Sequence, residues 1–255
     1  FDIKEVTVGS RLNDQNRQTN EFTRKIAIER PFYISESEVT NAEYKNFLAM
    51  HSSGEFNSIS LDQKEQPVVN VHWSDAAKFC NWLSREEGFE PFYIIKYGIV
   101  TGVYPSSTGY RLPTEAEWEA VAQNGITRFA WGSTFPPPNS TGNFSDKQIN
   151  SSSKDINNSY SDGYEVSAPI KSFNPNSNQI FDLYGNVSEW VHDFYIEKFG
   201  ENYTYSNLGQ VSGENHVIKG GSWMSSSAVT LGIPYRDSGT WGKVDLGFRV
   251  ARYAQ

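Results

Sequence analysis

The chain has 255 residues and a formal net charge of −8, and aromatic residues make up 15% of it. No apolar run approaches the roughly 18 residues that a membrane helix needs, and the mean hydropathy of −0.57 is typical of a soluble domain. The negative charge argues against nucleic acid as a partner, because phosphate binding needs a basic surface.

The predicted elements begin with short strands, because apolar residues alternate at Ile26–Ile28 and Phe32–Ile34. Three short helices follow, each with a recognisable start. The helix starts are Thr40 with Glu43 as a capping box, Ser74 as a simple cap, and Thr114 with Glu117 as a second capping box.

Cys80 is the only cysteine, so no disulfide can form within the chain. This fits a cytosolic protein and equally a bacterial surface protein that does not rely on disulfides. Cys80 lies on the apolar face of the second predicted helix, where we expect a buried and inert thiol. Because Phe1 is not an initiator methionine, we expect the numbering to begin after a leader.

Residues 131–178 are rich in Ser, Asn, Pro, Gly and Asp and poor in aliphatic residues. Such a stretch could be a linker between two domains. Phe144, Tyr160, Tyr164 and Ile170 interrupt it, which favours a long ordered loop region inside one domain.

Seven motif-like segments follow one another along the chain: Phe32–Asn41, Pro67–Trp73, Gly109–Glu119, Trp131-Gly132, Asp182–Trp190, Lys219–Trp223 and Leu246–Val250. In this order they resemble the formylglycine-generating-enzyme (sulfatase-modifying factor) family. The resemblance implies one α+β domain over residues 1–255, with the family's irregular C-type-lectin-like fold. In these motifs we expect Arg111, Arg249 and the Gly220-Gly221 pair to serve as scaffold.

The resemblance also implies which residues the catalysts need, namely two cysteines after the Gly-Gly-Ser-Trp motif that bind copper. The matching positions are Ser225 and Thr230, whose hydroxyls are hard donors with a far higher pKa than a thiol. We therefore expect no copper and no enzyme of this type. The related sulfoxide synthases use a histidine-rich iron site, but the four histidines include no HxxxH pair, and no nucleophile elbow for a Ser-His-Asp hydrolase is visible.

Family members carry structural calcium sites, and the resemblance implies two ligand sets in this chain. Calcium prefers six to eight oxygen ligands, several of which loop carbonyls can supply. The alternative is that these are turn residues that bind no ion. The first set is Asp182, Gly185, Val187 and Glu189, and the second is Asn143, Phe144, Asp162 and Tyr164.

The C-terminal part resembles the variable region of diversity-generating-retroelement proteins of the Treponema variable protein type, which implies a variable region over residues 220–249. In those proteins adenines are mutagenised, commonly in AAY codons, which can become Ser, Thr, Val, Gly, Pro or Asp. Ala228, Leu231, Ile233 and Tyr235 form an expected buried set, and strict alternation from Leu231 to Tyr235 predicts a strand-like segment. The expected ligand-binding residues are Ser225, Ser226, Ser227, Val229, Thr230, Gly232, Pro234, Asp237, Ser238, Gly239 and Thr240, all reachable from AAY, with the unreachable Trp241 as a scaffold anchor.

The sequence therefore predicts a non-catalytic binding protein on a bacterial or phage surface, lipid-anchored through a leader. The expected partner is a macromolecule, either a protein or a cell-surface glycan, bound without nucleic acid and without membrane insertion. Small residues with Tyr and Trp nearby are adaptable recognition chemistry. Two alternatives stay open: an invariant structural module of a cell-surface assembly, and an enzyme with an unrecognised site.

Overall fold

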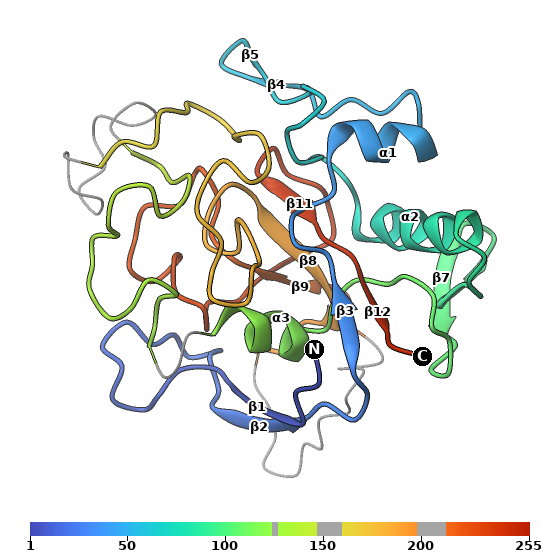
Figure 1. Ribbon diagram of the computed structural model, residues 1–255, viewed down its shortest axis with the longest axis horizontal. Helices are drawn as coiled ribbons and strands as arrows, with labels where there is room; N and C mark the ends of the chain where they lie inside the picture. Colours follow the sequence, from blue (N-terminus) through green and yellow to red (C-terminus); the bar gives the residue numbers. More distant parts are fainter. Residues whose placement is uncertain (124–126, 147–159, 198–212) are drawn as a thin grey trace.

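The computed structural model describes residues 1–123, 127–146, 160–197 and 213–255, and these form a mixed α+β structure, as predicted (Figure 1). No helix in this part of the chain is long and apolar enough to cross a membrane. The helices are α1 (Asn41–Phe47), α2 (Trp73–Glu86) and α3 (Glu115–Ala122). The strands are β1 (Glu5–Val8), β2 (Arg24–Ala27), β3 (Phe32–Ile34), β4 (Glu55–Phe56), β5 (Ile59–Ser60), β6 (Tyr93–Lys96), β7 (Ile99–Val103), β8 (Ser188–Phe194), β9 (His216–Lys219), β10 (Asp237–Gly239), β11 (Leu246–Phe248) and β12 (Ala251–Tyr253).

A four-stranded sheet lies at the centre of the molecule, in the order β10-β9-β8-β11 (Figure 1). Strands β8 and β11 run parallel, and the other two pairs are antiparallel. Trp190 of β8 is fully buried and donates its indole N–H to the carbonyl of Val71 at 2.9 Å. The sheet is thereby tied to the segment that leads into α2.

Two of the three helix caps predicted from the sequence are present in the structure. Thr40 and Thr114 both form the predicted capping boxes, with Glu43 and Glu117 respectively. The prediction of Ser74 as a cap is wrong, because α2 already begins at Trp73 after an extended His72 with no side-chain cap.

Two buried arginines act as scaffold, as expected of planar multi-donor groups. Arg111 makes a two-pronged ion pair with Glu117, with both N–O distances 2.6 Å. Arg249 pairs in the same way with Glu189 at 2.7 Å for both contacts and also donates to the carbonyls of Ser35 and Phe181.

The region 131–178 is built from turns and irregular backbone in its described parts. Phe144 and Tyr160 are buried there, with ring centroids 5.5 Å apart. Both rings belong to the main buried cluster of apolar side chains, so the described parts of this region pack against the core. Residues 147–159 of this region lie outside the described residues.

Candidate functional site

The segment 225–241, called the display segment below, starts as a series of turns. The N–H of Leu231 donates to the carbonyl of Ser227 at 3.1 Å, and the N–H of Gly232 donates to the carbonyl of Val229 at 3.2 Å. The residues from Ser225 to Thr230 are half-buried, so each exposes part of its side chain. Half-buried side chains that hold no backbone group can vary at little cost to the fold, whereas the hydroxyls of Ser227 and Thr230 accept each other's N–H and help to hold the turn.

The strand-like alternation predicted for Leu231–Tyr235 is wrong. Leu231 and Ile233 are buried as expected, but Gly232 and Pro234 between them are buried too. Because hydrogen-bonded turns hold this stretch, successive side chains do not alternate between core and solvent. The exposure expected of Gly232 and Pro234 is therefore wrong. Ala228, expected to be buried, is half-buried, and Tyr235 is half-buried, in line with the expectation that it is at least partly buried.

Arg128 fixes the backbone of the display segment. Its Nε donates to the carbonyl of Ala228 at 2.9 Å and its Nη2 to the carbonyl of Val229 at 3.3 Å. The same guanidinium pairs with Asp14 at 2.8 Å and with the buried Glu21 at 3.3 Å. A Cβ at Gly232 would lie only 2.7 Å from the Arg128 Nε, so this position favours glycine.

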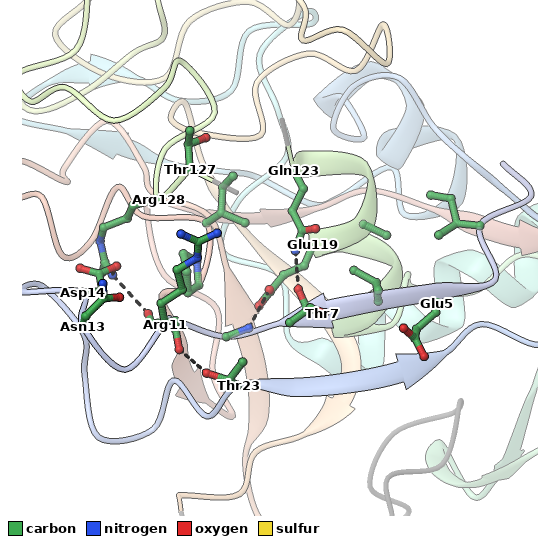
Figure 2. A pocket seen from close by; sticks show the side chains of 17 residues that line it. Glu5, Thr7, Arg11, Asn13, Asp14, Thr23, Glu119, Gln123, Thr127 and Arg128 are labelled. Atoms are coloured by element: carbon green, nitrogen blue, oxygen red, sulfur yellow. Dashed lines mark hydrogen bonds and ion pairs between the residues drawn. The ribbon is translucent and has the colours of Figure 1, made fainter. Parts of the chain in front are cut away.

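A pocket of about 630 Å³ opens beside Arg128, between the turn after β1 and the end of α3 (Figure 2). Ile233 and Pro234 of the display segment line it. Figure 2 shows the Arg128–Asp14 pair on one side and the bond from the Gln123 side chain to the carbonyl of Thr7 on the other. On each side of the pocket these polar groups form hydrogen bonds or ion pairs with neighbouring protein groups, and these bonds stabilise the fold.

The second half of the display segment forms strand β10 and the turn after it. Asp237, Ser238 and Gly239 are half-buried, and Thr240 and Trp241 are exposed. The Asp237 carboxylate pairs with Lys243 at 2.9 Å. These residues are therefore at least partly open to solvent, and their role in ligand binding stays a prediction.

The hydroxyls of Ser225 and Thr230, expected at the positions of the catalysts' copper-binding thiols, bond locally. The Ser225 Oγ accepts the N–H of Ser222 at 3.0 Å, and the Thr230 Oγ1 lies 3.1 Å from the Ser227 Oγ. Cys80 is fully buried in α2, and burial raises the pKa of its thiol. A protonated, inaccessible thiol is a poor nucleophile and a poor soft-metal ligand.

The second expected calcium set contains one buried oxygen atom that accepts no hydrogen bond from the described residues. The Asn143 Oδ1 is buried without a hydrogen-bond donor among the described residues. The Asp162 carboxylate accepts the N–H groups of Phe144 and Tyr164, both at 2.9 Å, which brings the expected ligands together. Burial raises the pKa of Asp162 to about 6, a shift that a nearby cation would reverse. Calcium binding at this set stays a prediction.

The first expected calcium set fits only in part. The two Glu189 oxygens are engaged by Arg249, and one of them also accepts the Trp118 indole N–H at 2.9 Å. Asp182 is different: its Oδ1 is buried and has no donor in the described part of the chain.

Glu38, which no sequence pattern marks as a ligand, is the carboxyl group that faces Asp182. Its Oε2 is also buried without a donor among the described residues. Burial, followed by the charge of Asp182, raises the pKa of Glu38, and burial raises the pKa of Asp182 to about 6. A shared proton or a cation would satisfy this pair. In the described residues no three His, Cys, Asp or Glu side chains form a metal cluster, so loop carbonyls would have to complete such a site.

Comparisons with known proteins agree on one family. The family profile described as "Sulfatase-modifying factor enzyme 1-like domain" matches residues 5–254. The formylglycine-generating enzyme of Mus musculus is 30% identical over 176 residues, which are 68% of this chain and 39% of that protein. The inactive Cα-formylglycine-generating enzyme 2 of the same species is 28% identical over 202 residues, 76% of this chain and 51% of that protein. The chain thus spans about half or less of these relatives' length.

A solved structure has a similar fold. Treponema denticola variable protein 1 superposes with a TM-score of 0.74 at 24% sequence identity, and the match covers 98% of this chain and 94% of that one. The similarity supports the C-type-lectin-like α+β fold that the sequence predicts.

Proposed function

Because the chain belongs to the sulfatase-modifying factor family, which includes both active enzymes and inactive members, we propose that it is a non-catalytic member that binds a macromolecular ligand through the display segment. The absence of thiols at Ser225 and Thr230 supports the non-catalytic part of this proposal. The proposed ligand is a protein or glycan at a cell surface.

The observation that carries the proposal is that residues 225–241 contain both buried side chains, which hold the segment in place, and side chains that reach solvent. Leu231 and Ile233 are buried and Arg128 holds the adjoining carbonyls, while the side chains from Ser225 to Thr230 reach solvent. A fixed backbone with partly exposed, small side chains is how antibody loops present adaptable contacts. The fold similarity to a variable protein supports the same interpretation of residues 220–249 as a variable region.

Binding arrays test the proposal directly. The parent chain is applied to one array of bacterial surface proteins and one array of glycans, and we expect it to retain at least one ligand. A variant with Ser226, Val229, Ser238, Thr240 and Trp241 all changed to Ala should lose that ligand. The matched control changes five other exposed residues to Ala: Leu12, Met50, Tyr97, Ile99 and Tyr104. Equal binding by parent and display variant would point to a structural module instead.

We further propose that calcium binds at Asn143 and Asp162 with the carbonyls of Phe144 and Tyr164, and that Asp182 and Glu38 form a second cation position. The cation would be structural, holding loops that have little core of their own. The buried oxygens without donors among the described residues support this assignment.

Calcium is therefore expected to raise the thermal stability of the chain. A ligand present at 100 times its dissociation constant adds about 2.7 kcal/mol to the free energy of unfolding. Melting curves in EDTA and in calcium chloride should differ accordingly, and Asn143→Ala or Asp162→Asn should shrink the difference. Asp62→Asn, which alters a surface ion pair with Lys45, serves as the control and should leave the calcium effect intact. Identical melting curves with and without calcium would refute both sites.

A further inference from the structure

Trp241 is presented to solvent on a rigid support. The residue is 71% exposed, yet its ring lies edge-to-face with that of His72, with centroids 4.5 Å apart. The next residue, Gly242, packs so closely that a Cβ there would lie 2.5 Å from the carbonyl carbon of Asn70. The Asn70 N–H also donates to the carbonyl of Lys243 at 3.0 Å, which holds the turn on the other side of the indole.

The backbone that supports Trp241 adopts a costly conformation at Asn70. Asn70 has φ +59, in the left-handed region, and its Nδ2 donates to the carbonyl of Ser53 at 2.7 Å. A non-glycine residue in this region costs energy and persists only where surrounding contacts hold it. An isolated exposed tryptophan needs no explanation, but one fixed by three separate contacts is pre-organised, and pre-organised groups lose little entropy on binding.

The residues near Trp241 in the chain are polar and include both hydrogen-bond donors and hydrogen-bond acceptors. Thr240 precedes it and is exposed, and the Lys243 ammonium two residues later pairs with the Asp237 carboxylate. The side chains of this pair are 47% and 42% exposed, so both retain room for a ligand. Within four residues of the exposed ring the chain thus carries a hydroxyl, an ammonium group and a carboxylate, which together can donate and accept hydrogen bonds.

This combination matches a sugar better than a protein surface. A pyranose ring has a flat face of C–H groups that stacks on an indole, and its rim hydroxyls both donate and accept hydrogen bonds. A protein hot spot instead sits within a ring of contacts that excludes water, whereas the neighbours of Trp241 are small or charged. We propose, resting on the proposed binding function, that Trp241 stacks on a pyranose of a cell-surface glycan while Asp237 and Lys243 bond to its hydroxyls.

Titration with defined oligosaccharides tests this proposal. The probes are chitohexaose, cellohexaose and mannohexaose, followed by tryptophan fluorescence and by saturation-transfer NMR. We expect at least one probe to bind with saturation transfer to its ring C–H protons. Trp241→Ala should weaken that binding at least tenfold, and Trp241→Phe should weaken it less. Asp237→Asn combined with Lys243→Met should weaken it with the indole still in place.

Tyr97→Ala is the matched control, because Tyr97 is a fully exposed aromatic at the tip of the β6–β7 hairpin. It should leave saccharide binding unchanged. If no probe binds, or if Trp241→Ala binds as tightly as the parent, the sugar assignment is overturned. The binding arrays separate this failure from failure of the binding function: capture of a protein that the display variant loses would retain the function and reject the glycan, whereas no capture on either array would reject both.

Discussion

Replacing Arg249 by Met is expected to lower the free energy of unfolding by about 3–5 kcal/mol. Arg249 is fully buried, and its removal would leave the Glu189 carboxylate charged in the core, where the Trp118 indole is its one remaining side-chain donor among the described residues. The carbonyls of Ser35 and Phe181 would lose a donor as well. Since whole domains are stable by only about 5–15 kcal/mol, urea denaturation should detect the change readily.

Two further variants make the result interpretable even if Arg249→Met folds poorly. The double variant with Glu189→Gln removes the stranded charge and should recover part of the loss, because a buried ion pair is often no better than a neutral replacement. Lys25→Met removes an exposed pair with Glu5 and should change stability by at most about 1 kcal/mol. A loss at Arg249 no larger than that at Lys25 would contradict the assigned role.

Acid is expected to destabilise the fold through two buried histidines. His216 stacks flat on Trp73, with centroids 3.6 Å apart and planes 7° apart, and also contacts Phe194. His192 lies 3.2 Å from the Tyr93 hydroxyl through its Nδ1. Burial lowers the pKa of His216 to about 4 and the pKa of His192 to about 3.

The direction of the effect follows from these values. An unfolded histidine has a pKa of about 6.5, so the unfolded chain binds more protons than the folded one as the pH falls below that value. The two buried neutral histidines make their full contribution to the free energy of unfolding above about pH 6.5. That contribution is lost progressively as the pH falls toward 4 and below. Asp162 and Asp182, with pKa values raised to about 6, act in the opposite direction, because their protonation relieves a buried charge.

His216→Gln isolates the histidine contribution. The variant cannot take up the proton, so the slope of unfolding free energy against pH between about 4 and 6 should change by about 1.4 kcal/mol per pH unit. Phe79→Leu removes a ring contact with Phe248 and leaves both buried histidines in place, so the stability that it loses should be the same at every pH. Parallel pH profiles for the parent and His216→Gln would show that His216 is not buried in its neutral form.

The parts of the fold that were predictable are governed by local sequence. The capping boxes at Thr40 and Thr114 need only residues three positions apart, and both are present. Ser74 failed as a cap because a distant contact sets the helix start: the Trp73 indole N–H donates to the carbonyl of Val191 at 2.8 Å. The order of the seven motifs predicted the family, which local propensity could not have done.

The candidate site was less predictable, because its support comes from far along the chain. The burial of Gly232 depends on Arg128, about a hundred residues earlier, and no local pattern marks that arginine. Glu38 lies in a motif that carried the family resemblance, but its place opposite Asp182 is set by tertiary packing. Trp241 was expected as an anchor, whereas its fixation by His72 and Asn70 depends on tertiary contacts that the sequence does not reveal.

The way Arg128 holds residues 228 and 229 has a consequence for evolution. Arg128 donates to main-chain oxygens, which every amino acid has. These hydrogen bonds therefore do not depend on which side chains stand at those positions. Repeated substitutions at residues 228 and 229 could therefore keep the hydrogen bonds that hold the backbone of the display segment. Gly232 marks the boundary of that freedom, since there it is the arginine itself that any added carbon atom would meet.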